Sequence, residues 1–182
     1  MLLPVVLYGN PVLRKVAKDI TLDYPELNKL IDDMLQTMDG ADGVGIAAPQ
    51  IGLDIRLFVV DANGFADQEP ECEGFRKAFI NAHIIERFGD KKTRSEGCLS
   101  IPGIHEEVTR YDGILMSYMN EKGETFEEEF TGVKAWIIQH EYDHIEGVLF
   151  IDYLSALRKR LLKSKLTGIT SGKCRVGYRT KQ

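Results

Sequence analysis

The segment TGVKAWIIQHEYDH at residues 131–144 constrains the fold of this chain more than any other. Thr131 can cap the start of a long apolar helix, and His140 and His144, four residues apart, then lie on the same helix face. Two imidazoles in this arrangement can hold one metal ion. Helix geometry turns Glu141 about 100° from His140, so it can reach a water on that ion and act as general base. The other elements must therefore pack around a metal-binding helix.

A third metal ligand has to come from another part of the chain, and a catalytic site must also keep one position open for water. Cys98 is the best candidate, because an adjacent glycine allows close backbone approach and because thiolates bind borderline and soft metals. Cys72 and Cys174 have no neighbouring histidine and are predicted to be free thiols. The sequence also leaves Glu146 and Asp152, downstream of the helix, as alternative ligands.

Composition favours one domain that spans residues 1–182. Hydrophobic residues make up 43% of the 182, enough for one core, and no linker divides the chain. The three cysteines are odd in number and widely spaced, which fits a reducing cytoplasm better than a disulfide scaffold. The first residues lack the basic region of a signal peptide, and charges interrupt every hydrophobic run. We therefore expect a cytoplasmic protein with no membrane partner.

Charge is unevenly distributed along the chain. Of its 23 Lys and Arg residues, nine lie in residues 158–182, which contain no acid, so the rest of the chain carries 14 basic and 28 acidic side chains. A basic segment on an acidic body fits contact with a polyanion such as RNA, and it fits a solvated helix and tail equally well. We expect no DNA partner.

Hydrophobic periodicity predicts two further helices. One begins near Pro25 and ends at Gly40 and Gly43. The other covers residues 154–166, with basic residues on one side and four leucines on the side expected to pack on the body: Leu154, Leu157, Leu161 and Leu162.

Strands are predicted between these helices from short β-branched runs bounded by turn residues. A polar loop at residues 62–77 is expected to bury little and to have no catalytic role, and residues 120–123 are expected to form a hairpin loop. The strands are expected at residues 55–61, 78–85, 106–110, 113–119 and 125–130. The fold class is therefore α+β, with antiparallel sheets packed around the central metal-binding helix and a C-terminal helix.

Three segments carry a family resemblance. GVGIAAPQ at residues 43–50, EGCLS at 96–100 and QHEYDH at 139–144 resemble the three motifs of the peptide deformylases, complete and in the family's order. The resemblance implies a metal-dependent hydrolase that removes the formyl group from the N-terminal formylmethionine of nascent polypeptides and releases formate. It also makes the ribosome a candidate partner of the basic C-terminal segment.

The resemblance assigns the metal site and its chemistry. Cys98, His140 and His144 are the implied ligands, with a water as the fourth. The implied cofactor is one Fe²⁺ per chain, for which Zn²⁺, Ni²⁺ or Co²⁺ can substitute, because this ligand set accommodates all four ions.

Three residues are implied to act on the substrate's reacting group. Glu141 deprotonates the water and later protonates the departing amine. The backbone N–H of Leu99 and the side-chain amide of Gln50 meet the negative charge that develops on the formyl oxygen.

Four more residues are expected to bind substrate. Val44 and Gly45 are implied by the resemblance to hydrogen-bond the peptide strand, although this glycine-rich segment also fits a tight turn. Val133 and Trp136 share the helix face of His140 and could floor a methionine pocket. This face could instead simply pack in the hydrophobic core, and for Val133 the two interpretations are equally supported. Trp136 is a bulky residue at a position where the family usually has an aliphatic one.

Two other functions fit parts of the sequence. The HExxH spacing alone also suggests a zinc endopeptidase, whose third ligand usually follows the helix, but no histidine follows His144. A catalytically silent protein could use the metal to hold its fold or could bind nascent chains. A closed structural site would need a fourth protein ligand, and no further Cys or His lies near these motifs. Glu141 would then also have no purpose.

Overall fold

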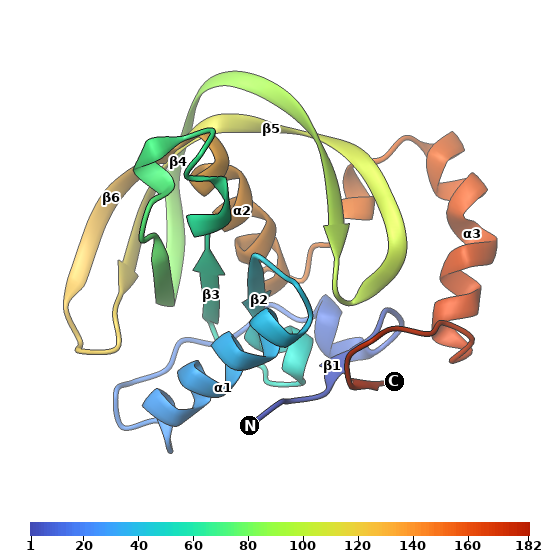
Figure 1. The fold of residues 1–182 in the computed structure, drawn as a ribbon, viewed down its shortest axis with the longest axis horizontal. Coiled ribbons are helices and arrows are strands. Elements are labelled where there is room, and N and C mark those ends of the chain that lie inside the picture. Colours follow the sequence, from blue (N-terminus) through green and yellow to red (C-terminus); the bar gives the residue numbers. More distant parts are fainter.

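The computed structural model describes residues 1–182, and its centre is a five-stranded antiparallel sheet in the order β2-β3-β4-β5-β6. The sheet and the three α-helices confirm the predicted α+β class (Figure 1). The sheet strands are β2 (Gly45–Ala47), β3 (Leu57–Asp61), β4 (Arg76–Cys98), β5 (Ile101–Met119) and β6 (Thr125–Thr131).

The hairpin of β4 and β5 is much longer than the sequence indicated. The predicted strands at 78–85, 106–110 and 113–119 are parts of these two elements, which pair along most of their length and curve over the helix α2 (Figure 1). Four register shifts interrupt the pairing, and such bulges bend a strand. Most side chains between Arg87 and Arg94 are exposed, so this part lacks the apolar alternation by which a strand is found in a sequence.

Helix α2 (Gly132–Ile145) lies within the fold, as predicted. Its apolar residues pack in a core shared with the sheet. Thr131 is at the N-cap position, but its side chain makes no capping hydrogen bond. A carboxylate oxygen of Glu69 instead accepts from the Val133 N–H at 2.9 Å, which satisfies a free donor of the first helical turn.

Glu69 belongs to the loop at residues 62–77, which is mostly exposed, as predicted, but buries three side chains that the prediction did not single out. Ala62, Cys72 and Phe75 are buried in the same core as α2. The apolar residues of this loop are too scattered to show periodicity, and they find the core through contacts that are distant in sequence. Cys72 is a free thiol, as expected.

Helix α1 (Leu27–Gly40) forms where the sequence predicted it. Its buried residues include Ile31, Met34 and Met38, which pack in a second core with residues of β2 and β3. The helix therefore lies against one face of the sheet at β2 and β3 (Figure 1).

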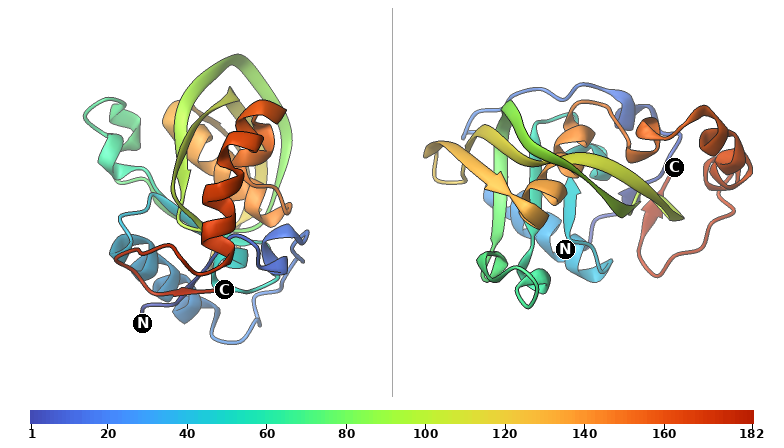
Figure 2. Two further views of the ribbon diagram at one scale, coloured as in Figure 1. Left: turned by 90° about the vertical axis from the view of Figure 1, so that its right-hand side faces the viewer. Right: turned by 90° about the horizontal axis from the view of Figure 1, so that it is seen from above.

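Helix α3 (Ala156–Thr170) corrects part of the prediction for the C-terminal helix. Leu162 and Ile169 are buried against the body, but Leu157 and Leu161 are 63% and 60% exposed. The helix touches the body along a narrow edge (Figure 2), so only part of its apolar surface is covered.

The two ends of the chain meet. Strand β1 (Val5–Val6) pairs in parallel with β7 (Thr180–Lys181), so the segment after α3 returns to the N-terminal strand (Figure 2). No helix has the length and hydropathy needed to cross a membrane. Five short 3-10 helices complete the fold: Pro11–Arg14, Ala48–Ile51, Asn63–Phe65, Pro70–Cys72 and Phe150–Tyr153.

Candidate metal centre

Cys98, His140 and His144 converge in the structure. One ligand atom from each lies within 4.8 Å of the others, and Sγ of Cys98 is 3.3 Å from Nε2 of His144. Tetrahedral ligands at 2.0–2.3 Å from an ion lie roughly 3.5 Å from one another. The donor set and its spacing therefore fit one tetrahedral metal ion with an open fourth position.

Cys98 reaches this place because it is the last residue of β4, directly after a register shift in the pairing with β5. The carboxylates that the sequence left as alternative ligands are engaged elsewhere. Glu146 pairs with Arg56 at 2.5 Å, and Asp152 pairs with Arg14 at 2.6 Å. Neither belongs to the ligand group.

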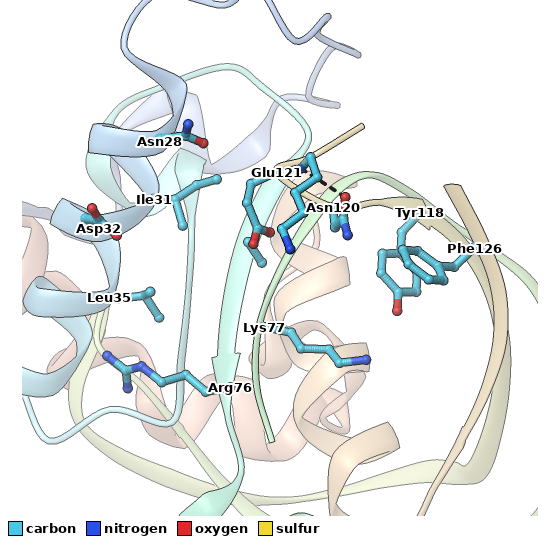
Figure 3. Close-up of a pocket in the computed structure, with 12 residues that line it drawn as sticks. Asn28, Ile31, Asp32, Leu35, Arg76, Lys77, Tyr118, Asn120, Glu121 and Phe126 are labelled. Carbon is cyan, nitrogen blue, oxygen red and sulfur yellow. Dashed lines mark hydrogen bonds between the residues drawn. The ribbon is translucent and has the colours of Figure 1, made fainter. Parts of the chain in front are cut away.

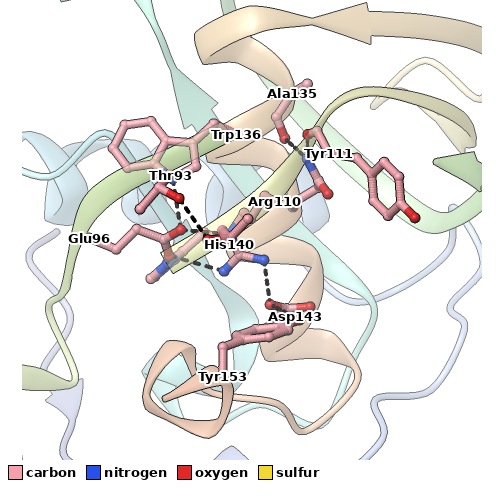
Figure 4. Close-up of polar contacts among 11 residues, drawn as sticks. Thr93, Glu96, Arg110, Tyr111, Ala135, Trp136, His140, Asp143 and Tyr153 are labelled. Carbon is pink, nitrogen blue, oxygen red and sulfur yellow. Dashed lines mark hydrogen bonds and ion pairs between the residues drawn. The ribbon is translucent and has the colours of Figure 1, made fainter. Parts of the chain in front are cut away.

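Glu96 fixes the orientation of the His140 ring. Its Oε1 lies 2.7 Å from Nδ1 of His140 (Figure 4). Burial raises the pKa of Glu96, but hydrogen bonds from His140 and Arg110 lower it to about 2. An ionised carboxylate only accepts hydrogen bonds, so Nδ1 carries the proton and Nε2 is left for a metal ion.

Glu96 is itself held by a buried network of charged and polar side chains, formed by Arg110, Asp143 and Tyr153. Arg110 donates from Nε to Oε2 of Glu96 at 2.6 Å and from Nη1 to Oδ2 of Asp143 at 2.8 Å (Figure 4). The Tyr153 hydroxyl donates to the same Asp143 oxygen at 2.8 Å. Sequence reasoning assigned no role to Arg110, Asp143 or Tyr153. The available signal was an arginine in a strand beside buried positions, which needs an acidic partner.

The two histidines differ in protonation: His144 is neutral and ready to bind a metal, whereas His140 holds a proton that a metal ion would replace. Burial lowers the pKa of His144 well below its ordinary value, so its ring is neutral, as a ligand must be. Burial also lowers the pKa of His140, but hydrogen bonds to Cys98 and Glu96 raise it well above its ordinary value. A metal cation bound here would displace that proton, because its positive charge would interact with the same groups, Cys98 and Glu96, that stabilise the protonated ring.

Glu141 is buried beside the ligands with one carboxylate oxygen, Oε2, that has no hydrogen-bond partner. Burial raises its pKa to about 7, which suits a group that takes up and returns a proton near neutral pH. Gly45 makes room for it: a Cβ at position 45 would lie 2.6 Å from Oε1 of Glu141. Any larger residue there would displace the Glu141 side chain.

The amide of Gln50 faces the centre with a fixed orientation. Its Oε1 accepts from the Ala47 N–H at 2.9 Å, so the NH₂ group points the other way, toward Cys98 Sγ at 3.5 Å and Ser100 Oγ at 3.2 Å. The backbone N–H of Leu99 makes no hydrogen bond within the protein. The unbonded N–H of Leu99 and the NH₂ group of Gln50, which contacts Cys98 and Ser100, therefore both lie beside the ligands.

A cleft of about 420 Å³ opens next to this group, lined by Val44, Gly45, Trp136 and Glu141 among others. Val44 is 40% exposed at its rim, and Nε1 of the half-buried Trp136 donates to Oε2 of Glu96 at 2.7 Å. Val133 does not line the cleft and packs in the core, as the alternative interpretation had it. Ile137 of the same helix lines the cleft instead of Val133, and the sequence had suggested no role for Ile137.

Another cavity, of about 540 Å³, lies between α1 and the β5–β6 hairpin (Figure 3). Its lining includes Asp32, Arg76, Lys77 and Glu121 but no histidine or cysteine. The chemistry of the molecule is therefore concentrated in the cleft beside the metal ligands.

A Cys-His-His ligand set with an open position, a buried carboxylate and two amide donors beside a cleft define a metal-dependent hydrolase. The comparisons with known proteins name its family. The family model described as "Polypeptide deformylase" matches residues 2–160, so the chain belongs to the peptide deformylase family. It removes the N-terminal formyl group from nascent polypeptides.

Similar proteins cover nearly the whole chain. A peptide deformylase of Christiangramia forsetii is 51% identical over 98% of this chain and 95% of its own length, and one of Cytophaga hutchinsonii is 49% identical over 100% and 97%. The crystal structure of the peptide deformylase from Thermus thermophilus superposes with a TM-score of 0.83 at 37% identity, covering 94% of this chain and 99% of that one.

Proposed function

We propose that Cys98, His140 and His144 hold one Fe²⁺ ion, which serves deformylation in a single catalytic domain that spans residues 1–182. The proposal is supported by the convergence of one thiolate and two imidazoles with an open fourth position. The same ligand set accommodates Zn²⁺, Ni²⁺ and Co²⁺, so the choice of Fe²⁺ is based on the resemblance to the family.

When bound, the ion supplies Lewis-acid chemistry, which lowers the pKa of a water and polarises the formyl carbonyl. Glu141 takes the proton of the attacking water on its free Oε2 and later gives a proton to the departing amine. Its burial and its pKa of about 7 support both steps. The products are formate and a peptide with a free amino terminus.

Leu99 and Gln50 stabilise the negative charge that develops on the formyl oxygen. The free N–H of Leu99 and the NH₂ of Gln50, whose direction is set by the Ala47 N–H, support this role, because donors held in place stabilise developing charge best. Gln50 would exchange its contact with Cys98 or Ser100 for the formyl oxygen.

Val44, Gly45 and Trp136 bind the peptide. Strand β2 begins at Gly45 and is an edge strand of the sheet, and an edge offers free backbone groups to an extended peptide. Trp136 walls the cleft beside His140, where the methionine side chain of the substrate would lie. Val133 supports this wall only from the core, through its position on α2.

The ribosome is the proposed macromolecular partner, and the cytoplasm the proposed location, because the substrate is a nascent chain. Support comes from the exposed Leu157 and Leu161 on a helix that also carries exposed Lys159 and Arg160. Replacing Lys159 and Arg160 with glutamate should abolish co-sedimentation with ribosomes and leave turnover of short peptides unchanged. Unchanged co-sedimentation would remove the ribosome from the proposal.

The observation that carries the proposed mechanism is the unpaired Oε2 of Glu141 beside the three ligand atoms. The test is formate release from formyl-Met-Ala-Ser by iron-loaded protein prepared without oxygen, with the unformylated peptide as control. We expect formate from the first peptide and no cleavage of the second. Internal cleavage of either peptide without formate would indicate an endopeptidase instead.

A further inference from the structure

The end of the chain returns to the active site. Residues 176–182, here called the C-terminal strap, follow α3 and lie against the N-terminal strand (Figure 2). The N–H of Val5 donates to the Arg179 carbonyl at 2.8 Å, and the N–H of Leu7 donates to the Lys181 carbonyl at 2.9 Å. The family model ends at residue 160, so the strap lies beyond the part of the chain that it matches.

Two strap residues, Val176 and Tyr178, line the same cleft as Cys98 and Glu141. The Tyr178 hydroxyl donates to the carbonyl oxygen of Leu99 at 2.8 Å. Tyr178 is half-buried and also packs against the core that α1 shares with the sheet. The strap is therefore anchored on one side to β1 and on the other to the turn that follows Cys98.

This hydrogen bond bears on the oxyanion donor. Leu99 lies in the two-residue turn between β4 and β5, and no other hydrogen bond reaches its carbonyl. The next residue, Ser100, is held by Gln50 at its hydroxyl and by the Tyr8 N–H at its carbonyl. The N–H and carbonyl of Leu99 lie in the two peptide planes that meet at its Cα, so holding the carbonyl plane restricts the backbone rotations by which the N–H could turn away.

We propose that the C-terminal strap is part of the active site and that Tyr178 is a positioning residue, which orients Leu99 so that its N–H faces the reacting formyl oxygen. Val176 and the Tyr178 ring also form a wall of the peptide cleft. The inference rests on the proposed role of Leu99.

The test compares Tyr178→Phe with Tyr24→Phe. Tyr24 packs against the same core, but its hydroxyl has no partner, so it is a matched control for loss of a tyrosine hydroxyl. Tyr178→Phe should lower kcat about tenfold, less than the roughly 10²-fold loss of an oxyanion donor, and leave KM within about twofold. Leu99 acts on charge that exists only in the transition state, so kcat carries the effect.

Two further measurements separate positioning from a merely structural role. The visible spectrum of Co²⁺-substituted Tyr178→Phe should match that of the wild type, because the metal ligands are not moved. Tyr178→Ala, which also removes the wall, should raise KM for formyl-Met-Ala-Ser in addition to lowering kcat.

The proposal is overturned if Tyr178→Phe retains full kcat, if Tyr24→Phe loses as much, or if the Co²⁺ spectrum shifts. None of these outcomes touches the proposed function, which is judged by formate release from the wild-type protein and by the loss caused by Glu141 substitution.

Discussion

Oε1 of Glu96 lies 2.7 Å from Nδ1 of His140, so a carboxylate from the β-hairpin sets the orientation of a metal-binding ring on the helix. The second residue of the HExxH pair, His144, has no such partner, and its Nδ1 is buried without a hydrogen bond. The first imidazole is therefore the more firmly held of the two.

Substituting Glu96 should weaken metal binding. In Glu96→Gln the amide accepts less strongly from Nδ1 of His140, and loss of such an outer hydrogen bond typically costs about 10- to 100-fold in metal affinity. Titration with Co²⁺, followed by its visible spectrum, measures the change. Glu107→Gln, on an exposed residue of the same hairpin, is the control. Equal affinity in both variants would show that Glu96 does not support the site.

Gly45→Ala should impair catalysis while metal is retained. The new methyl group would lie 2.6 Å from Oε1 of Glu141 and push the carboxylate away from the ligands, and a misplacement of this size can cost about 10² in rate. Formate release and metal content are measured on the same samples. Gly64→Ala, where a Cβ meets nothing within 4 Å, should behave as wild type. Full activity of Gly45→Ala would contradict the geometry.

Arg110→Met should destabilise the fold. It leaves the carboxylates of Glu96 and Asp143 buried without their cation, which typically costs about 3–5 kcal/mol. Lys92→Met breaks an exposed pair with Asp112 and should cost at most about 1 kcal/mol. Urea unfolding of both variants measures the free energies. A similar small loss for both would mean that the buried network adds nothing to stability.

Removal of the metal should abolish deformylation. Chelation should end formate release, and added Fe²⁺ should restore it, because the bound ion lowers the pKa of the attacking water. Release that continues in metal-free protein would show that the ion is not required.

Much of the candidate site could be predicted because it depends on local spacing. His140 and His144 share a helix face whatever surrounds them, and the helix, α1 and the antiparallel β class follow from patterns of a few residues. Cys98 was reached partly by chemistry and partly by resemblance, and its alternatives Glu146 and Asp152 were excluded only by their ion pairs.

What the sequence did not predict depends on contacts between distant residues. The pairing of Arg110 with Glu96 and Asp143 needs the register of a bent hairpin against α2, which no local pattern encodes. The burial of Cys72 and the reach of Tyr178 to Leu99 are contacts of the same kind. Four leucines on one side of the C-terminal helix predicted that all four would pack against the rest of the protein. Only part of that side is covered, and Leu157 and Leu161 remain exposed.

The most direct test of the account is formate release by Glu141→Gln protein whose metal content equals that of the wild type. Glutamine keeps the shape of the side chain but cannot accept the proton of the attacking water. The account predicts that metal is retained and that kcat falls by about 10²-fold or more. Formate release within a few-fold of wild type would contradict it, because the only free buried carboxylate beside the ligands would then not be the base.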